Sequence, residues 1–229
     1  MTTVLAIDGP GGAGKGTVSK RLAESLGWHL LDSGALYRLV GIAARKRGVD
    51  FAHVAQLADI ARDLDVEFRV AEAGELVRTW LEGEQIDHLL RTETAGSDAS
   101  VVAAIPEVRA ALLQRQRDFA VPPGLVADGR DMGTVVFPDA DLKVFLTASV
   151  EERAHRRYKQ LKEQGLSANL RALREELEVR DRRDSERAAA PLKPAPDAWI
   201  LDTTGIGIDE VVAMIRERIA GILSSRESN

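Results

Sequence analysis

The chain has 229 residues, enough for one α/β domain with insertions, and its net charge of -5 argues against a broad nucleic-acid-binding face. Cysteine is absent, which excludes disulfides, thiolate metal sites and a cysteine nucleophile, and the four histidines are scattered without ligand spacing. The sequence has neither an apolar run of membrane-spanning length nor a signal-peptide pattern, so we expect a cytoplasmic protein without a membrane partner. Arginine supplies 24 of the 31 basic residues, which fits either phosphate binding or the codon bias of a GC-rich genome.

Residues 4–17 read VLAIDGPGGAGKGT and predict a strand, a glycine-rich loop and the start of a helix. In such a loop, successive backbone N–H groups converge on one anion because no Cβ blocks the approach, and the helix N-terminus favours negative charge. Gly9, Gly14 and Lys15 fit the phosphate-loop pattern G-x-x-x-x-G-K. Gly16 stands where serine or threonine is expected, and Thr17 follows one place late, which leaves Mg²⁺ ligation by a loop hydroxyl open. A glycine-rich turn without a ligand is the alternative, and the strand–loop–helix context favours the phosphate loop.

The remaining elements follow from the spacing of apolar residues and from turn signals. In chain order we expect helix 17–26, strand 28–31, helices 36–47 and 51–64, strands 66–70 and 76–81 around a turn at 72–75, a third short strand at Ile86, helical structure over 86–104, helix 107–119, strands 125–127 and 142–146, helices 150–164 and 170–187, strand 199–201 and helix 208–223. Strands that alternate with helices indicate a parallel sheet covered on both faces. The antiparallel hairpin reads as an insertion that moves relative to the core.

Polar residues follow two of the expected strands, at the edge where open parallel sheets bind ligands. Ser33 follows one strand, and Arg38 lies one helical turn further on, where a solvated helix residue is an equally good interpretation. Asp128 ends another strand and resembles the second acidic site of P-loop enzymes, which helps to hold Mg²⁺ or its waters. Arg109 lies near the start of a helix, where its side chain can point back toward the insertion.

The long charged helix carries Arg180, Asp184 and Arg187 at spacings that place them on one face. Transfer of a phosphoryl group between two anionic nucleotides requires fixed cations, and arginine provides bidentate contacts. An exposed, salt-bridged helix is the plainer interpretation of such a charge run. Arg156 and Arg157 have the same two interpretations, with a mobile flap as the functional one.

Five segments give the chain a resemblance to the bacterial cytidylate kinases, a branch of the nucleoside monophosphate kinases. They are GPGGAGKGT (9–17), LLDSGALYR (30–38), ADGRDMGTVVFPDA (127–140), EERAHRR (151–157) and RDRRDSERAAAPL (180–192). The resemblance covers nearly the whole chain and accounts for Gly16, because GKG-T is the monophosphate-kinase form of the loop. It implies a single α/β domain of the P-loop kinase fold, with a central parallel sheet between helices. The implied parts are a core (1–36, 104–152 and 188–229), a monophosphate-binding insertion with a small antiparallel sheet (37–103) and a lid with flanking helices (153–187).

The resemblance also implies roles for individual residues. The ATP phosphates are bound by Gly9, Pro10, Gly11, Gly12, Ala13, Gly14, Lys15, Gly16 and Thr17, and the lid contributes Arg156 and Arg157. The acceptor phosphate is clamped by Arg38, Arg130 and Arg187, which with Lys15 form the implied catalytic set. The cytosine edge is read by Ser100, Arg109 and Asp131, with Ser33 beside them, and the sugar hydroxyls contact Arg180 and Asp184. Mg²⁺ is implied to be held mainly by phosphates and water, without a protein cage, with Thr17 and Asp128 as candidate ligands.

The activity implied by the family is phosphoryl transfer from ATP to CMP or dCMP, with Mg²⁺, in pyrimidine nucleotide metabolism. The implied partners are these nucleotides, without nucleic acid or membrane, and we expect a monomer. Physical chemistry agrees with the base reading: a carboxylate such as Asp131 accepts from the cytosine amine, whereas uracil presents a carbonyl oxygen there. A kinase for UMP or AMP is the nearest alternative. A GTP-dependent switch is disfavoured because the sequence has no N-K-x-D motif, and a nucleotide-binding scaffold predicts binding without turnover.

Overall fold

The computed structural model describes residues 2–69, 78–90, 92–163 and 165–227. Within them the chain forms two compact units, one of residues 1–32 and 116–229 and one of residues 33–115. The elements of the first unit are β1 (Thr3–Asp8), α1 (Lys15–Leu26), β2 (His29–Asp32), β6 (Gly124–Gly129), the single-turn π-helix η1 (Met132–Val136), β7 (Leu142–Thr147), α7 (Val150–Glu163), α8 (Leu170–Glu186), β8 (Trp199–Asp202) and α9 (Ile208–Glu227). Those of the second are α2 (Ser33–Lys46), α3 (Val54–Arg62), β3 (Val66–Arg69), β4 (Arg78–Leu81), β5 (Glu84–Gln85), α4 (Asp87–Leu90), α5 (Glu93–Val102) and most of α6 (Pro106–Arg117).

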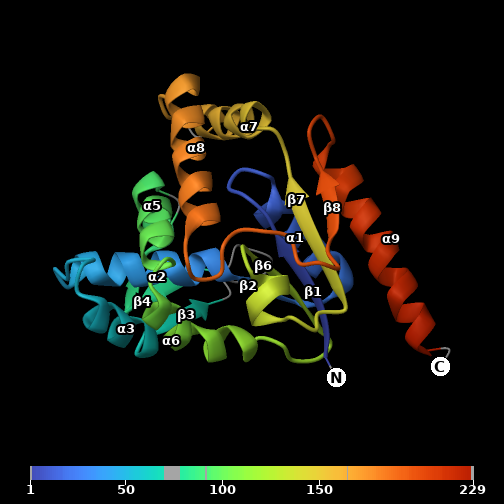
Figure 1. Cartoon of the computed structure of the whole chain (residues 1–229), viewed down its shortest axis with the longest axis horizontal. Helices are drawn as coiled ribbons and strands as arrows, with labels where there is room; N and C mark the ends of the chain where they lie inside the picture. Colours follow the sequence, from blue (N-terminus) through green and yellow to red (C-terminus); the bar gives the residue numbers. More distant parts are fainter. Residues whose placement is uncertain (1, 70–77, 91, 164, 228–229) are drawn as a thin grey trace. The chain divides into compact units, whose positions relative to one another are not determined.

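A five-stranded sheet in the order β2-β6-β1-β7-β8 forms the centre of the first unit (Figure 1). All its neighbouring strands pair in parallel, so their carboxyl ends meet at one edge. The register places Asp8 opposite Gly129, and Asp32 opposite Asp128. This arrangement confirms the predicted α/β fold with a central parallel sheet, and it puts the acidic strand ends where open sheets bind ligands.

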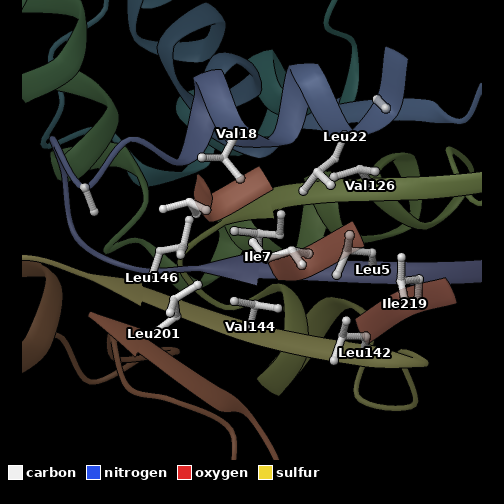
Figure 2. Packing of buried hydrophobic residues seen from close by; sticks show 14 residues of the cluster. Leu5, Ile7, Val18, Leu22, Val126, Leu142, Val144, Leu146, Leu201 and Ile219 are labelled. Carbon is white, nitrogen blue, oxygen red and sulfur yellow. The ribbon is translucent and has the colours of Figure 1, made fainter. Parts of the chain in front are cut away.

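An apolar cluster between the sheet and helices α1 and α9 holds the first unit together (Figure 2). Val18 and Leu22 lie one helical turn apart on α1 and are buried with Leu5 and Ile7 of β1. Ile219 of α9 joins the same cluster. Helix α1 ends at Gly27, whose left-handed conformation (φ 66°) lets its N–H donate to the Ala23 and Glu24 carbonyls, as expected for a glycine C-cap. The core thus anchors the loop that joins β1 to α1.

The second unit contains the predicted hairpin, with β4 pairing antiparallel to both β3 and β5. The predicted turn at 72–75 lies outside the described residues. The third strand is Glu84–Gln85, and Ile86 follows it as a fully buried residue rather than belonging to it. Arg45 of α2 pairs with the buried Asp98 of α5, and one of these contacts spans 2.8 Å from Nη2 to Oδ1. This pair fastens two helices of the unit to each other.

Several predicted boundaries are wrong by a few residues. α1 begins at Lys15 and α2 at Ser33, each earlier than the apolar pattern indicated, because their first turns are built from glycine and polar residues. α3 begins later, at Val54. The stretch predicted as helical over 86–104 contains two helices, and the second is preceded by Thr92, whose hydroxyl caps α5 by accepting from the Ala95 N–H. The π-helix η1 has no counterpart among the predicted elements.

Candidate active site

The glycine loop between β1 and α1 has a backbone that other residues do not readily adopt. Gly9 has φ 147°, and a Cβ built on it would lie 2.0 Å from the carbonyl oxygen of Leu146. Gly12 and Gly14 have φ values of 79° and 92°, in the left-handed region. The glycines are therefore needed for the path of the chain, and the loop ends at the N-terminus of α1, where an anion is favoured.

Lys15, the first residue of α1, is buried beside this loop with 6% of its surface exposed. Its Nζ donates to the Pro10 carbonyl at 3.0 Å and lies 4.0 Å from Oδ1 of Asp128. Burial and, to a smaller extent, the positive charge of Arg130 together lower the pKa of Lys15 to about 7, against the opposing effect of Asp128. An anion bound at the loop would favour the charged ammonium, so Lys15 is suited to contact a phosphate.

Asp8 ends β1 directly before the loop and connects it to the turn after β6. Its Oδ1 accepts the N–H of Met132 and its Oδ2 accepts the N–H of Gly133, both at 2.8 Å. Met132 and Gly133 supply the first N–H groups of η1, and the first N–H groups of a helix have no acceptor within the helix itself. Burial raises the pKa of Asp8 to about 7, although both hydrogen bonds oppose the shift. Sequence reasoning missed this residue, and the signal was an acid at the end of an apolar strand.

Two of the predicted arginines converge on the loop within the first unit. A Cβ built on Gly11 would meet Nη2 of Arg130 at 3.6 Å and Nη1 of Arg180 at 3.8 Å. Arg130 follows β6, and its Nε donates to the buried carboxylate of Asp184 on α8 at 3.0 Å. The predicted residues of α8 therefore face the phosphate loop, and an entirely exposed, salt-bridged helix is the wrong interpretation for this part of it.

The two other predicted residues of this unit are also buried. Asp131 follows Arg130 and precedes η1. Arg187, just past α8, donates from Nε to the Ala190 carbonyl at 2.7 Å, while the Leu192 N–H donates to the Asp184 carbonyl at 2.8 Å. The chain after α8 is thus fixed by main-chain contacts next to Asp184.

Three arginines of α7 lie in the segment predicted as the lid (153–187). Arg156 donates from Nη1 to the Ala13 carbonyl at 3.3 Å and from Nη2 to the Thr203 carbonyl at 2.5 Å. Arg157 donates to Gln160 of its own helix at 2.7 Å. Arg153, which sequence reasoning did not single out, is 3% exposed and donates to the Gly11 carbonyl at 2.9 Å. Two arginines of α7 therefore contact the main chain of the glycine loop in this conformation.

The second unit carries the other four predicted residues. Ser33 begins α2 and Ser100 lies near the end of α5, and both are buried. Arg109 of α6 donates to the Ala103 carbonyl at 3.3 Å, and its guanidinium carbon lies 5.8 Å from the centre of the Tyr37 ring. Arg38, the residue after Tyr37, is half-buried on α2. These residues come from three helices of one unit, with Arg109 held over the ring that precedes Arg38.

The residues near the loop offer few protein ligands for a metal ion. The described part of the chain has no group of three or more His, Cys, Asp or Glu side chains that could hold one. Asp128 Oδ2 lies 3.6 Å from where a Cβ on Gly16 would stand, and Thr17 is exposed on the first turn of α1. Carboxylate and hydroxyl oxygens suit Mg²⁺, which usually keeps several waters and binds substrate phosphates. The residues present fit an ion that arrives with a nucleotide.

No described helix combines the length and the apolar character that crossing a membrane requires.

Comparison with known proteins gives one consistent result. The sequence model of the family described as cytidylate kinase matches residues 5–221. A cytidylate kinase of Pseudomonas putida is 57% identical over 220 residues, which is 96% of each chain. Those of Pseudomonas aeruginosa PAO1 and Stutzerimonas stutzeri are 60% and 58% identical, over 93% and 95% of each chain. Among solved structures, an uncharacterized protein from Eubacterium ventriosum matches with a TM-score of 0.54 at 14% identity, over 96% of this chain and 99% of that one, and so shares the fold.

Proposed function

Since the chain belongs to the cytidylate kinase family, we propose that it transfers the γ-phosphoryl group of ATP to CMP or dCMP, giving ADP and CDP or dCDP. The proposal rests on the positions of Arg130 and Arg180, whose guanidinium groups both lie beside Gly11 of the loop that carries the buried Lys15. Phosphoryl transfer depends on positioning and on cations around the transferring group, rather than on a nucleophilic side chain. An acceptor phosphate oxygen attacks directly, and the cluster of cations offsets the repulsion between two anionic substrates.

For the donor, we assign the loop residues 9–17 to the ATP phosphates. The loop N–H groups and the N-terminus of α1 bind the phosphate oxygens, and Lys15 bridges toward the transferred group. Mg²⁺ supplies further charge neutralisation of the phosphates when bound, with Asp128 and Thr17 as the protein groups that would hold it or its waters. Arg156 and Arg157 belong, in this proposal, to the segment that closes over ATP and excludes water, which would otherwise accept the phosphoryl group.

For the acceptor, we assign residues from both units. Arg38, Arg130 and Arg187 clamp the CMP phosphate by bidentate contacts. The cytosine amine donates to Asp131, and the ring acceptors receive hydrogen bonds from Arg109 and Ser100, with Ser33 adjacent. Arg180 and Asp184 contact the sugar hydroxyls, and Arg180, whose Nη1 lies beside Gly11, also adds its charge near the transferring group. The burial of Asp131 supports its part, because a buried carboxylate attracts the cytosine amine and repels the carbonyl oxygen that uracil presents at the same edge.

A panel of acceptors tests the proposal. The full chain is given ATP and Mg²⁺ with CMP, dCMP, UMP, AMP or GMP, and ADP release is followed in a coupled assay. We expect kcat/KM for CMP to exceed that for UMP by about a hundredfold or more, the scale that a buried hydrogen-bond mismatch produces. Comparable use of UMP or AMP would favour the other monophosphate kinases, and nucleotide binding without ADP release would favour a scaffold. A cytoplasmic location and a monomeric state stay predictions.

A further inference from the structure

Arg153 of α7 uses its guanidinium group entirely on protein atoms. Its Nε donates to the Ala148 carbonyl at 3.1 Å and its Nη1 to the Gly11 carbonyl at 2.9 Å. Nη1 and Nη2 also bind the two carboxylate oxygens of Asp181 at 3.2 and 2.5 Å. The group is thus fixed on three sides while being almost fully buried. Arg153 is therefore a structural contact of the glycine loop.

Asp181 places this contact on the helix that carries proposed substrate residues. It follows Arg180 in the sequence and lies three residues before Asp184, which pairs with Arg130. A bidentate arginine–carboxylate pair fixes orientation as well as distance. The rotation and axial position of α8 are therefore set against the main chain of Gly11, the residue where Arg180 and Arg130 meet.

Packing between α7 and the loop limits other arrangements. A Cβ on Gly12 would lie 3.1 Å from the Cβ of Arg153, so helix and loop are in direct contact. The Gly11 carbonyl points toward Arg153, which leaves the loop N–H groups for an anion. The buried side chain of Arg153 therefore contacts both the glycine loop and α8.

We propose that Arg153 and Asp181 are positioning residues that hold α8 in register with the glycine loop, so that Arg180 is directed at the transferring phosphoryl group. The inference rests on the proposed phosphoryl transfer and adds to it two residues outside the assigned substrate contacts.

A double-mutant cycle on kcat tests the proposal. Asp181→Asn removes one charge of the pair, Arg180→Met removes the directed group with little change in volume, and the third variant combines them. Asp181→Asn should misplace the Arg180 cation, and Arg180→Met removes it. Each single variant should therefore lower kcat by about 30-fold, with KM for ATP changed by less than about threefold. If Asp181 acts through Arg180, the double variant is no slower than the slower single variant. Losses that multiply would overturn the proposal.

The matched control is Glu178→Gln on the same helix, whose carboxylate pairs with Arg174 at 2.9 Å in a solvent-exposed ion pair. It removes the same charge one turn away, and we expect kcat within about twofold of the wild type because exposed pairs contribute little. A loss as large as that of Asp181→Asn would contradict the proposal.

Asp181→Glu covers the case in which Asp181→Asn fails to fold. It keeps the charge and lengthens the side chain by one methylene, so kcat should fall while the melting temperature stays close to that of the wild type. Hydrogen exchange gives a readout independent of turnover: amides of 11–13 and 180–186 should exchange faster in this variant, and those of α9 should not. Unchanged exchange and unchanged kcat would overturn the proposal, whereas a wild type that never releases ADP with CMP would contradict only the proposed function.

Discussion

The two units of the molecule differ most in the charges that they bury. The first unit buries Asp8, Lys15, Asp128, Asp131, Arg153, Asp184 and Arg187. Among the described residues of the second unit, Asp98 is the buried charged residue, and its other buried polar groups are the hydroxyls of Ser33, Thr79 and Ser100. Burial of a charge disfavours folding unless partners compensate for it. The first unit is therefore organised around buried charged side chains, and the second around apolar packing and neutral hydrogen-bonding groups.

This difference matches the division of labour in the proposed reaction. A transferring phosphoryl group needs cations that are already in place, because reorganisation at the moment of reaction would add to the barrier. Recognition of a base needs hydroxyls and a few oriented donors. The first unit is thus expected to determine turnover and to read the cytosine amine through Asp131, and the second to contribute neutral groups to acceptor binding. The following predictions test that division, beginning with the largest expected effect.

Replacing Lys15 by methionine should lower kcat by a hundredfold or more, because it removes a preorganised charge from the phosphate loop. The fold should remain, since a buried ammonium near Arg130 is itself unfavourable. Turnover with CMP and thermal unfolding followed by circular dichroism measure the two effects. Near-normal turnover in a folded Lys15→Met variant would remove Lys15 from the mechanism.

Replacing Asp131 by alanine should reduce kcat/KM for CMP by about 30-fold and that for UMP by much less, since only cytosine donates to this carboxylate. The ratio of the two values, measured in the same coupled assay, is the relevant quantity. Equal losses with both acceptors would show that Asp131 supports the turn before η1 without reading the base.

The pH dependence of ATP binding should reveal the state of Lys15. Its pKa is lowered to about 7 in the free protein, so above this value the side chain is neutral and must take up a proton when it contacts a phosphate. We expect proton uptake at pH 8, measured by calorimetry in two buffers with different ionisation enthalpies, and KM for ATP rising by up to about fivefold between pH 7 and 8. The Lys15→Met variant is the control and should take up fewer protons.

The lowered pKa of Lys15 also makes the free energy of unfolding depend on pH. Between about 7 and 10.5, the unfolded chain holds the Lys15 proton and the folded chain does not, so the free energy of unfolding should rise with pH in this window. Asp8, with its pKa raised to about 7, has the opposite effect between 3.8 and 7. The stability difference between the wild type and Lys15→Met isolates the first contribution, and a difference that does not vary from pH 7 to 10 would contradict it.

Replacing Arg45 by methionine in the second unit should have the smallest effect on turnover. It removes the partner of Asp98, a buried carboxylate, and the free energy of unfolding should fall by about 1–2 kcal/mol. kcat with CMP should stay within about twofold of the wild type, because the pair fastens α2 to α5 and contacts no assigned substrate group. A loss of turnover comparable to that of Lys15→Met would remove the distinction between the units.

Sequence reasoning predicted the parallel sheet, the hairpin and the glycine loop because each depends on neighbours in the chain. It missed η1 because the group that accepts its first N–H groups, Asp8, lies 124 residues away from Met132. Arg153 was overlooked for a similar reason: within a charged helix, nothing local distinguishes a buried guanidinium from exposed ones. The meeting of Arg130 and Arg180 at Gly11 depends on tertiary packing, which spacing along the chain does not determine.

The most direct test of the account is a crystal structure of the protein with CMP, Mg²⁺ and a non-hydrolysable ATP analogue. The account predicts that Arg38 of the second unit and Arg130 and Arg187 of the first place guanidinium nitrogens about 2.7–3.2 Å from oxygens of the CMP phosphate, with Lys15 at the terminal phosphate of the analogue. A CMP phosphate contacted by residues of one unit alone, with Lys15 away from the analogue, would contradict it.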